Sequence, residues 1–158
     1  MRRYNAPWDR LLTGASIGFI AVLAGVAVVL ALTLSPWLAI LPLAILLASA
    51  LFAVRGFRIE SGSVVVERLL WSSTLPLQGL RAARADRDAF RQSARTFGNG
   101  GAFAFTGWYA HPALGEFRAF VTDRDRAVVL EWPHEKVVLS PDAPDEFVRE
   151  ISAFVVPS

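Results

Sequence analysis

The chain opens with a long apolar block that is interrupted only once. No charged residue occurs from Leu11 to Val54. A spanning helix needs about 20 apolar residues to cross about 30 Å of hydrocarbon, so the pattern predicts two spans, at about residues 11–34 and 37–54. Pro36 lies between them, where it removes a backbone donor and favours a turn. Because so short a connection joins antiparallel neighbours, we expect a transmembrane helical hairpin over residues 1–56.

The arginines around this block predict its orientation. Arg2, Arg3 and Arg10 precede the first span, Arg55 and Arg58 follow the second, and the turn carries no charge. The positive-inside rule places such ends in the cytoplasm. We therefore expect a multi-pass protein of the cell (inner) membrane with both termini cytoplasmic. A cleaved signal peptide and a buried helical hairpin of a soluble protein are the alternatives, and the length of the uncharged block disfavours both.

Small residues recur within the first span. Gly14, Gly18, Ala21 and Gly25 follow a small-xxx-small spacing, which lets two helices approach closely. Packing against the second helix of the same hairpin is the preferred interpretation. A homodimer through Gly14, Gly18 and Gly25 is the alternative.

Beyond residue 56 the hydrophobic pattern changes to short runs that are typical of strands. Residues 57–60 and 64–70 flank the turn Ser61-Gly62-Ser63, which predicts a β-hairpin. Residues 74–78 form a further short strand, in which Pro76 predicts an edge or end position. The later runs are 102–110, 116–122, 127–132 and 136–139. Strands at this spacing predict an antiparallel meander within a second domain, residues 57–158.

Residues 80–97 fit two patterns, and a helix is expected after residue 140. Arginines at 81, 84, 87, 91 and 95 recur every three or four residues, as on a helix face, whereas alternation from Leu80 fits the start of a strand. Ser140, with prolines and acidic residues after it, predicts a capped helix start. Phe147, Ile151 and Phe154 form the apolar stripe of that helix, which we expect to close the open side of the sheet.

The chain resembles the small bacterial PH-domain membrane proteins, in which a helical hairpin precedes one pleckstrin-homology-like barrel. The residues that carry the resemblance are Phe97-Gly-Asn-Gly-Gly-Ala-Phe103, Gly107-Trp-Tyr109, Phe117–Thr122 and Ser140–Phe147. The resemblance implies an α+β membrane protein. Its transmembrane hairpin precedes a PH-like antiparallel β barrel or sandwich of about seven strands, capped by a C-terminal amphipathic helix. It also implies a strand at 80–86 and a basic connection at 87–96.

Composition removes several classes of function. Cysteine is absent, which excludes disulfides, thiolate metal sites and thiol catalysis. Charges are mixed along residues 59–158 rather than basic, so nucleic-acid binding gains little support. No Ser–His–Asp order, paired-carboxylate pocket or metal-ligand spacing occurs. We therefore expect no enzymatic activity, no cofactor, no metal and no nucleic-acid partner.

One segment is a candidate anion site. Glycine turns present backbone N–H groups that bind anions, and neighbouring guanidinium groups would add charge. The candidate residues are Arg84, Arg87, Arg91, Arg95, Gly98, Asn99, Gly100 and Gly101. The alternative is a glycine hairpin whose arginines face water or anionic lipid. The turn Ser61-Gly62-Ser63 carries no Lys or Arg, so the resemblance does not extend to a phosphoinositide site there.

These observations predict a membrane-anchored, non-enzymatic PH-like interaction module on the cytoplasmic face, with the lipid bilayer and a protein as its partners. Two alternatives stay open. One is a sensor of anionic lipid or other anions that uses the basic 81–95 segment. The other is a protective membrane protein of the bacteriocin-immunity type.

Overall fold

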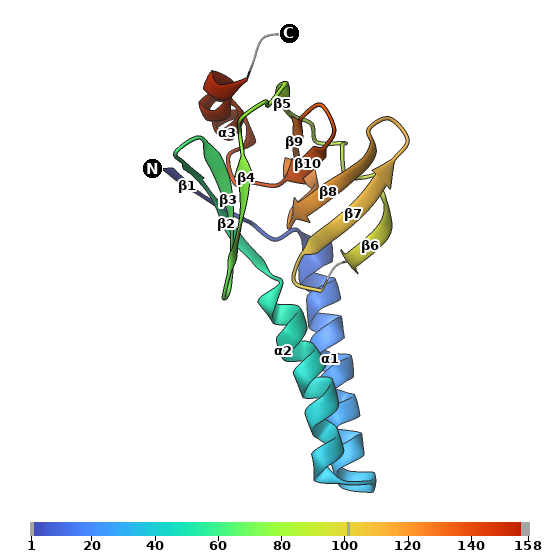
Figure 1. The fold of residues 1–158 in the computed structure, drawn as a ribbon. Helices are drawn as coiled ribbons and strands as arrows, with labels where there is room; N and C mark the ends of the chain where they lie inside the picture. Colours follow the sequence, from blue (N-terminus) through green and yellow to red (C-terminus); the bar gives the residue numbers. More distant parts are fainter. Residues whose placement is uncertain (1, 101, 156–158) are drawn as a thin grey trace.

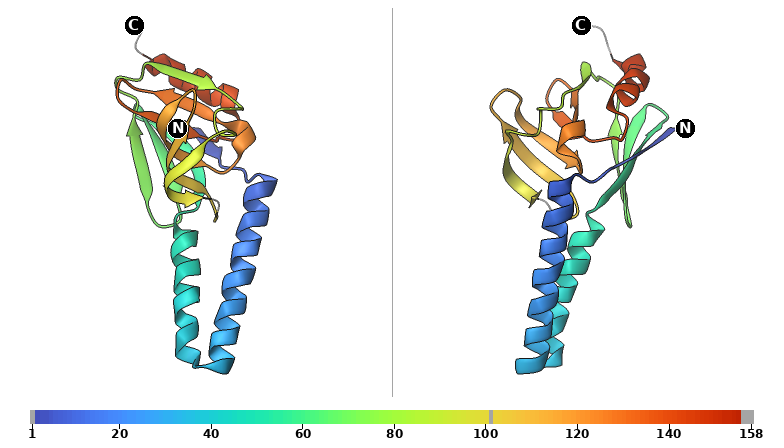
Figure 2. Two further views of the ribbon diagram at one scale, coloured as in Figure 1. Left: turned by 90° about the vertical axis from the view of Figure 1, so that its right-hand side faces the viewer. Right: turned by 180° about the vertical axis from the view of Figure 1, so that it is seen from behind.

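The computed structural model describes residues 2–100 and 102–155, and it consists of a pair of helices below a β domain (Figure 1). Helices α1 (Arg10–Thr33) and α2 (Ile40–Leu51) are joined by the short 3₁₀ helix η1 (Pro36–Ala39). They run alongside each other and leave the β domain on the same side in every view (Figure 2). The chain therefore enters and leaves the helix pair at the base of the β domain.

Helix lengths distinguish the two predicted spans. Helix α1 has 24 residues and is, among the residues described, the one helix long and apolar enough to cross a membrane by length and composition. The second apolar helical segment, Pro36–Leu51, is shorter, because the chain turns into strand β2 at Val54. One candidate span is present, and the second span stays a prediction.

The strands form two sheets rather than a closed barrel. One sheet has the order β1-β2-β3-β4, and the other has the order β5-β9-β10-β8-β7-β6. The first-sheet strands are Arg2–Asn5, Val54–Glu60, Ser63–Arg68 and Ser72–Pro76. In chain order, the second-sheet strands β5–β10 are Ala82–Ala85, Ala94–Gly100, Phe105–His111, Gly115–Val121, Val128–Glu131 and Lys136–Leu139. The architecture is a β-sandwich-like domain.

Strand β1 is an element that the sequence pattern did not predict. It precedes the first helix, yet it pairs antiparallel with β2, with Tyr4 opposite Phe57 and Asn5 opposite Gly56. Tyr4 is buried there, and its ring packs edge-on against Phe147 at 5.1 Å. Residues 2–5 thus belong to the first sheet, although the helix pair separates them in the sequence from the other strands of that sheet. The division into residues 1–56 and 57–158 stays a prediction.

The meander prediction is wrong at one pairing. Strands β8 and β10 run parallel, with Ala119 opposite Val138, whereas the other described pairings are antiparallel. A parallel pair needs a crossover, and here the chain crosses through β9 on the outer side of β10. Strand β4, which ends at Pro76, is an edge strand as predicted.

Two apolar cores hold the sandwich together, one on each face of the second sheet. Alternate residues of β8 and β10 point to opposite faces: Phe120 and Leu139 enter the core between the sheets, whereas Val121 and Val138 enter the outer core. The outer core also contains Phe90, from the 86–93 connection, and Leu12, the third residue of α1. The helix pair is therefore packed onto the domain at its base.

The 80–97 segment follows the family resemblance in part. Residues Ala82–Ala85 form the edge strand β5, and the chain then turns before β6 begins at Ala94. Helical periodicity of the arginines is misleading here. The glycine turn expected at 98–101 is wrong as well, because Gly98 and Gly100 lie within β6. Gly101 lies outside the described residues.

Helix α3 (Pro144–Ile151) covers the end of the sandwich, as expected, and buries Phe147 and Ile151. Ser140 does not cap it. The Ser140 hydroxyl is buried and accepts hydrogen bonds from the backbone N–H of Thr122 at 2.8 Å and of Asp123 at 3.3 Å. Ser140 therefore joins the ends of the parallel strands β8 and β10 instead.

The small residues of α1 do not pack against α2. A Cβ atom added to Gly14, Gly18 or Gly25 would meet no described atom within 4 Å outside the local helix backbone and adjacent residues. The buried residues of α1 are Ser16, Ala27 and Leu12, and at 100° per residue they lie on the opposite face of the helix. The preferred interpretation of this spacing is wrong, and the glycine face points outward.

Candidate functional site at the base of the β domain

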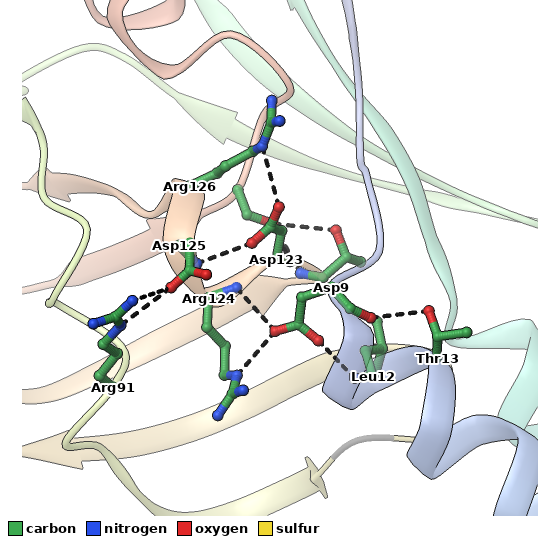
Figure 3. Close-up of polar contacts among 10 residues, drawn as sticks. Asp9, Leu12, Thr13, Arg91, Asp123, Arg124, Asp125 and Arg126 are labelled. Atoms are coloured by element: carbon green, nitrogen blue, oxygen red, sulfur yellow. Dashed lines mark hydrogen bonds and ion pairs between the residues drawn. The ribbon is translucent and has the colours of Figure 1, made fainter.

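Asp9 joins α1 to the β domain (Figure 3). As the N-cap of α1 it accepts a hydrogen bond from the Leu12 backbone N–H at 2.6 Å. Its other carboxylate oxygen accepts from the Arg124 side chain at 2.9 Å, and the Asp9 backbone N–H donates to the Thr122 carbonyl at 3.0 Å. One carboxylate thus satisfies a free donor of the helix and holds the loop after β8.

The charge state of Asp9 follows from these contacts. Burial raises the pKa of the carboxyl, but the hydrogen bonds from Leu12 and Arg124 and the positive charge of Arg124 outweigh it, so the pKa lies below the ordinary value of 3.8. Asp9 is therefore ionised at neutral pH, and the ion pair with Arg124 is present.

The first two turns of α1 are part of the domain. Leu12 is fully buried in the outer core, and Ser16 is buried where its hydroxyl accepts a hydrogen bond from the Phe103 backbone N–H at 2.9 Å. The ring of Phe103 also packs against Phe19 and Trp8, with centroids 6.4 Å and 6.2 Å apart. The helix pair and the β domain therefore meet in a fixed orientation.

A groove opens between α2 and the second sheet. It encloses about 650 Å³. One wall is the last turns of α2, and the other is the face of β6–β8 that points toward the first sheet. The lining includes Ile45, Ala48, Phe52, Phe97, Trp108 and Phe120. Its size is within the range of small-molecule sites in proteins.

Strand register explains why these side chains share one face. Phe97 lies opposite Trp108, and Trp108 lies opposite Arg118, so three side chains form a row across β6, β7 and β8. Phe120, two residues after Arg118, points to the same face. The close approach of the strands depends on glycine: a Cβ on Gly98 would lie 2.7 Å from the Cα of Gly107. Gly98 thus shapes the floor of the groove.

Two arginines enter this apolar groove from different sheets. Arg68, at the end of β3, and Arg118, in β8, both lie over the ring of Phe120, at 5.2 Å and 5.0 Å from its centroid. Neither forms a salt bridge with a described residue, and the buried Nε of Arg68 has no hydrogen-bond partner there. Burial, and then the charge of Arg118, lower the pKa of Arg68.

The arginines singled out in the sequence are placed differently. Arg84 bonds Glu131 at 2.5 Å, and Arg91 bonds Asp125 at 2.6 Å (Figure 3). Arg95 donates to the carbonyl of Gly98 at 3.3 Å. These side chains are engaged with separate acceptors, so the structure does not bring them together around one anion.

The remaining members of that candidate set show no common site either. Arg87 lines a hollow together with Arg126 and the carboxylates of Asp125 and Asp145. Gly98 and Gly100 are strand residues, while Gly101 and the side chain of Asn99 lie outside what the structure describes.

No catalytic constellation emerges from the described residues. They contain no group of three or more His, Cys, Asp or Glu side chains that could hold a metal. Nδ1 of His111 accepts hydrogen bonds from the backbone N–H groups of Ala113 and Leu114 at 3.1 Å and 3.3 Å, which is a structural role in a turn.

Sequence reasoning missed the two arginines of the groove. One signal was available: Arg118 is the lone charge within the apolar run Phe117–Thr122, on the strand face that alternation assigns to the core. A charged residue at a core position is unusual enough to mark a functional candidate. Nothing local marked Arg68 as its neighbour.

Comparison with known proteins identifies the domain that carries this groove. No curated protein and no solved structure matches the chain. The family described as bacterial PH domain matches residues 55–154, which include strands β3–β10, helix α3 and all of β2 except Val54. That match covers more than half of the chain and agrees with the resemblance seen in the sequence, so the protein belongs to the bacterial PH-domain family.

Proposed function

We propose that this protein is a membrane-anchored, non-catalytic interaction module whose PH domain is held against the cytoplasmic face of the membrane. The observation that carries the proposal is the surface of the helix pair. Only 11% of the most apolar window of α1 is buried. A core helix of a soluble protein would be covered, so this exposed apolar surface calls for lipid around it.

The dimensions of the two helices support insertion as a pair. At about 1.5 Å per residue, α1 is about 36 Å long. Its first two turns, up to Ser16, pack against the β domain and stay outside the bilayer. The part of α1 that remains is comparable in length with the segment Pro36–Leu51. Two short helical segments of similar length can span a bilayer that thins slightly around them.

The orientation is argued from the two ends of the chain. Strand β1 and helix α3 both belong to the β domain, so both ends of the described chain lie on the same side of the helix pair. Arg10 and Arg55 lie at the domain end of the helices, and the turn at η1 carries no charge. By the positive-inside rule, this arrangement supports a cytoplasmic domain.

A protein partner is proposed for the open edge of the second sheet. Strand β6 has β7 on one side and no described strand on the other. Its Phe97 side chain is 77% exposed. An exposed edge strand offers free backbone donors and acceptors that a strand of another protein can pair with.

The anchoring proposal is tested by alkaline carbonate extraction combined with a C-terminal reporter that is active in only one compartment. We expect the full chain to remain in the membrane pellet and the reporter to be active in the cytoplasm. Release into the supernatant would refute the anchor. An extracytoplasmic reporter would refute the orientation alone.

The partner proposal is tested by photo-crosslinking in native membranes from full chains that carry the crosslinker at Phe97 in β6 or, as the matched control, at Gln78 beyond β4. We expect one discrete protein adduct from Phe97 that Gln78 does not give. The same adducts from both positions would contradict recognition through β6.

A further inference from the structure

We infer that the groove between α2 and strands β6–β8 binds an anionic phospholipid, with the lipid phosphate between Arg68 and Arg118 and an acyl chain along α2. This inference rests on the proposed membrane anchor. It gives the module a lipid ligand at a place other than the turn Ser61-Gly62-Ser63, which carries no cation.

The charge in the groove requires a counter-ion. Arg68 and Arg118 converge on the ring of one residue, Phe120, and no described carboxylate forms a salt bridge with either. Two cations held together in a half-buried apolar site are destabilising unless an anion joins them. Glu67, the acidic residue next to Arg68 in sequence, is engaged by Arg3 and Arg58 at 2.8 Å and 3.6 Å. The site is therefore short of negative charge.

Guanidinium geometry favours a phosphate as that anion. Each guanidinium presents a planar set of N–H donors that can bond two oxygens of one phosphate. The buried Nε of Arg68, which has no partner among the described residues, is such a donor. A phosphodiester between the two arginines would satisfy it and neutralise part of the repulsion.

The apolar wall favours a lipid over a soluble phosphate. The groove continues from the arginines along Ile45 and Ala48 of α2 and Phe52 at its end. Other apolar side chains of this helix, including Leu41, Leu43 and Leu47, are exposed. Trp108, which is 40% exposed, stands beside it. Indole rings are enriched at the depth of lipid headgroups. A ligand that is anionic at one end and apolar at the other matches both halves of the groove.

The site also lies at the correct depth. Its wall on α2 is the end of the helix nearest the β domain, where Phe52 packs against Trp71 with centroids 5.2 Å apart. If the helix pair is inserted, this end meets the headgroup layer of the leaflet that faces the β domain. A phospholipid of that leaflet can enter the groove from the side without leaving the bilayer.

The experiment uses the full chain, purified from nanodiscs that contain equal parts of phosphatidylcholine and phosphatidylglycerol. Lipids that stay on the protein in mild detergent are counted by mass spectrometry. We expect the wild type to retain phosphatidylglycerol over phosphatidylcholine by about tenfold, as for a difference of about 1.4 kcal/mol. A wild type without this preference overturns the proposal.

Charge-matched double variants locate the site. Arg68→Gln with Arg118→Gln should abolish the preference, and its melting temperature should stay equal or rise because a repulsion is removed. Arg84→Gln with Arg91→Gln removes the same charge from exposed pairs and should leave the preference intact. Equal loss of the lipid preference in both double variants would overturn lipid binding in the groove. It would indicate attraction of the whole domain to anionic lipid.

Two further arms identify the occupant. Ala48→Trp fills the groove from the exposed face of α2 without a change of charge, and it should also remove the preference; retention would place the lipid elsewhere. Inorganic phosphate should not displace the lipid, and displacement would assign the arginines to a soluble anion. Carbonate extraction of the same wild-type protein distinguishes failure of the two proposals. Release from the membrane would refute the membrane anchor. Retention in the membrane without a lipid preference would refute only lipid binding in the groove.

Discussion

Arg91 and Arg118 carry the same charge in contrasting surroundings. The Arg91 side chain is 57% exposed and bonds Asp125 on a neighbouring loop (Figure 3). Arg118 is half-buried over an aromatic ring, beside a second arginine and without a described carboxylate. Along the chain, arginines are more closely spaced in residues 81–95, which contain Arg91, than around Arg68 and Arg118. In the fold, Arg68 and Arg118 lie together over one aromatic ring without a described carboxylate, whereas Arg84 and Arg91 each have one, so the surroundings of an arginine matter more than the number of arginines along the chain.

Reversal of one charge in each region should give the largest separation. Arg118→Glu places a carboxylate beside Arg68, so an internal ion pair should replace the anion. We expect about a tenfold loss of phosphatidylglycerol retention together with a higher melting temperature. Arg91→Glu places a third carboxylate near Asp88 and Asp125, and it should slightly lower the melting temperature while lipid retention is unchanged. Lipid mass spectrometry and thermal unfolding of the two variants measure these effects. Similar losses of phosphatidylglycerol in both variants would contradict the difference between Arg91 and Arg118.

A second contrast concerns the two ion pairs drawn together in Figure 3. Asp9 is partly buried, with its side chain 11% exposed, caps α1 and holds Arg124, whereas Asp125 is an exposed partner of Arg91. Asp9→Ala should lower the free energy of unfolding by about 0.5–2 kcal/mol, the range for loss of an N-cap. Asp125→Ala should change it by less than about 1 kcal/mol. Denaturant unfolding of the full chain in detergent measures both changes in free energy. Equal changes would mean that burial does not make the Asp9–Arg124 pair more stabilising than the Asp125–Arg91 pair.

The same carboxylate predicts a dependence on acid. Because its folded pKa lies below 3.8, Asp9 contributes stability that is complete above the unfolded value and is lost as the pH falls through the folded value. Asp9→Asn keeps an acceptor for Leu12 but lacks the charge. The variant should be less stable than the wild type at pH 7, and the difference should shrink below pH 3.8. A constant difference across that range would exclude the carboxylate as its source.

A moderate effect of high pH is expected at the polar contact between Tyr4 and helix α3. The Tyr4 hydroxyl donates to Glu150 at 2.7 Å, and burial, followed by the hydrogen bond to Glu150, raises the pKa of Tyr4 to about 12. The neutral phenol contributes stability below pH 10, and this contribution is lost as the pH rises toward 12. Tyr4→Phe should cost about 1 kcal/mol at pH 8 and make unfolding less sensitive to alkali. An unchanged alkaline profile would refute the assignment.

Local patterns in the sequence predicted the local elements. The first predicted span, residues 11–34, matches α1 to within one residue at each end, and the run Lys136–Leu139 is strand β10 with the same bounds. In the turn between β2 and β3, Ser61 and Gly62 both have positive φ, a conformation that glycine adopts without steric cost. In each case, neighbouring residues contain the information that determines the element.

The elements that escaped prediction depend on residues far apart in the chain. Strand β1 is four residues long and acquires its identity from β2, on the other side of the helices. The parallel pairing of β8 with β10 leaves no local signature. The groove combines a helix with strands of two different sheets, so Arg68 and Arg118, fifty residues apart, become neighbours only in the folded chain. Pairing at long range is not encoded in periodicity.

Strand β1 has a consequence for how the protein is made. Residues 2–5 are synthesised before Gly56, the partner of Asn5, and both apolar helices lie between them in the chain. The first strand must therefore remain unpaired until β2 has been synthesised, and its docking completes the sheet afterwards. Docking requires that the intervening segment return to the side from which it started. Pairing of β1 with β2 is therefore a late step of folding, and it depends on the helix pair that lies between the two strands in the chain.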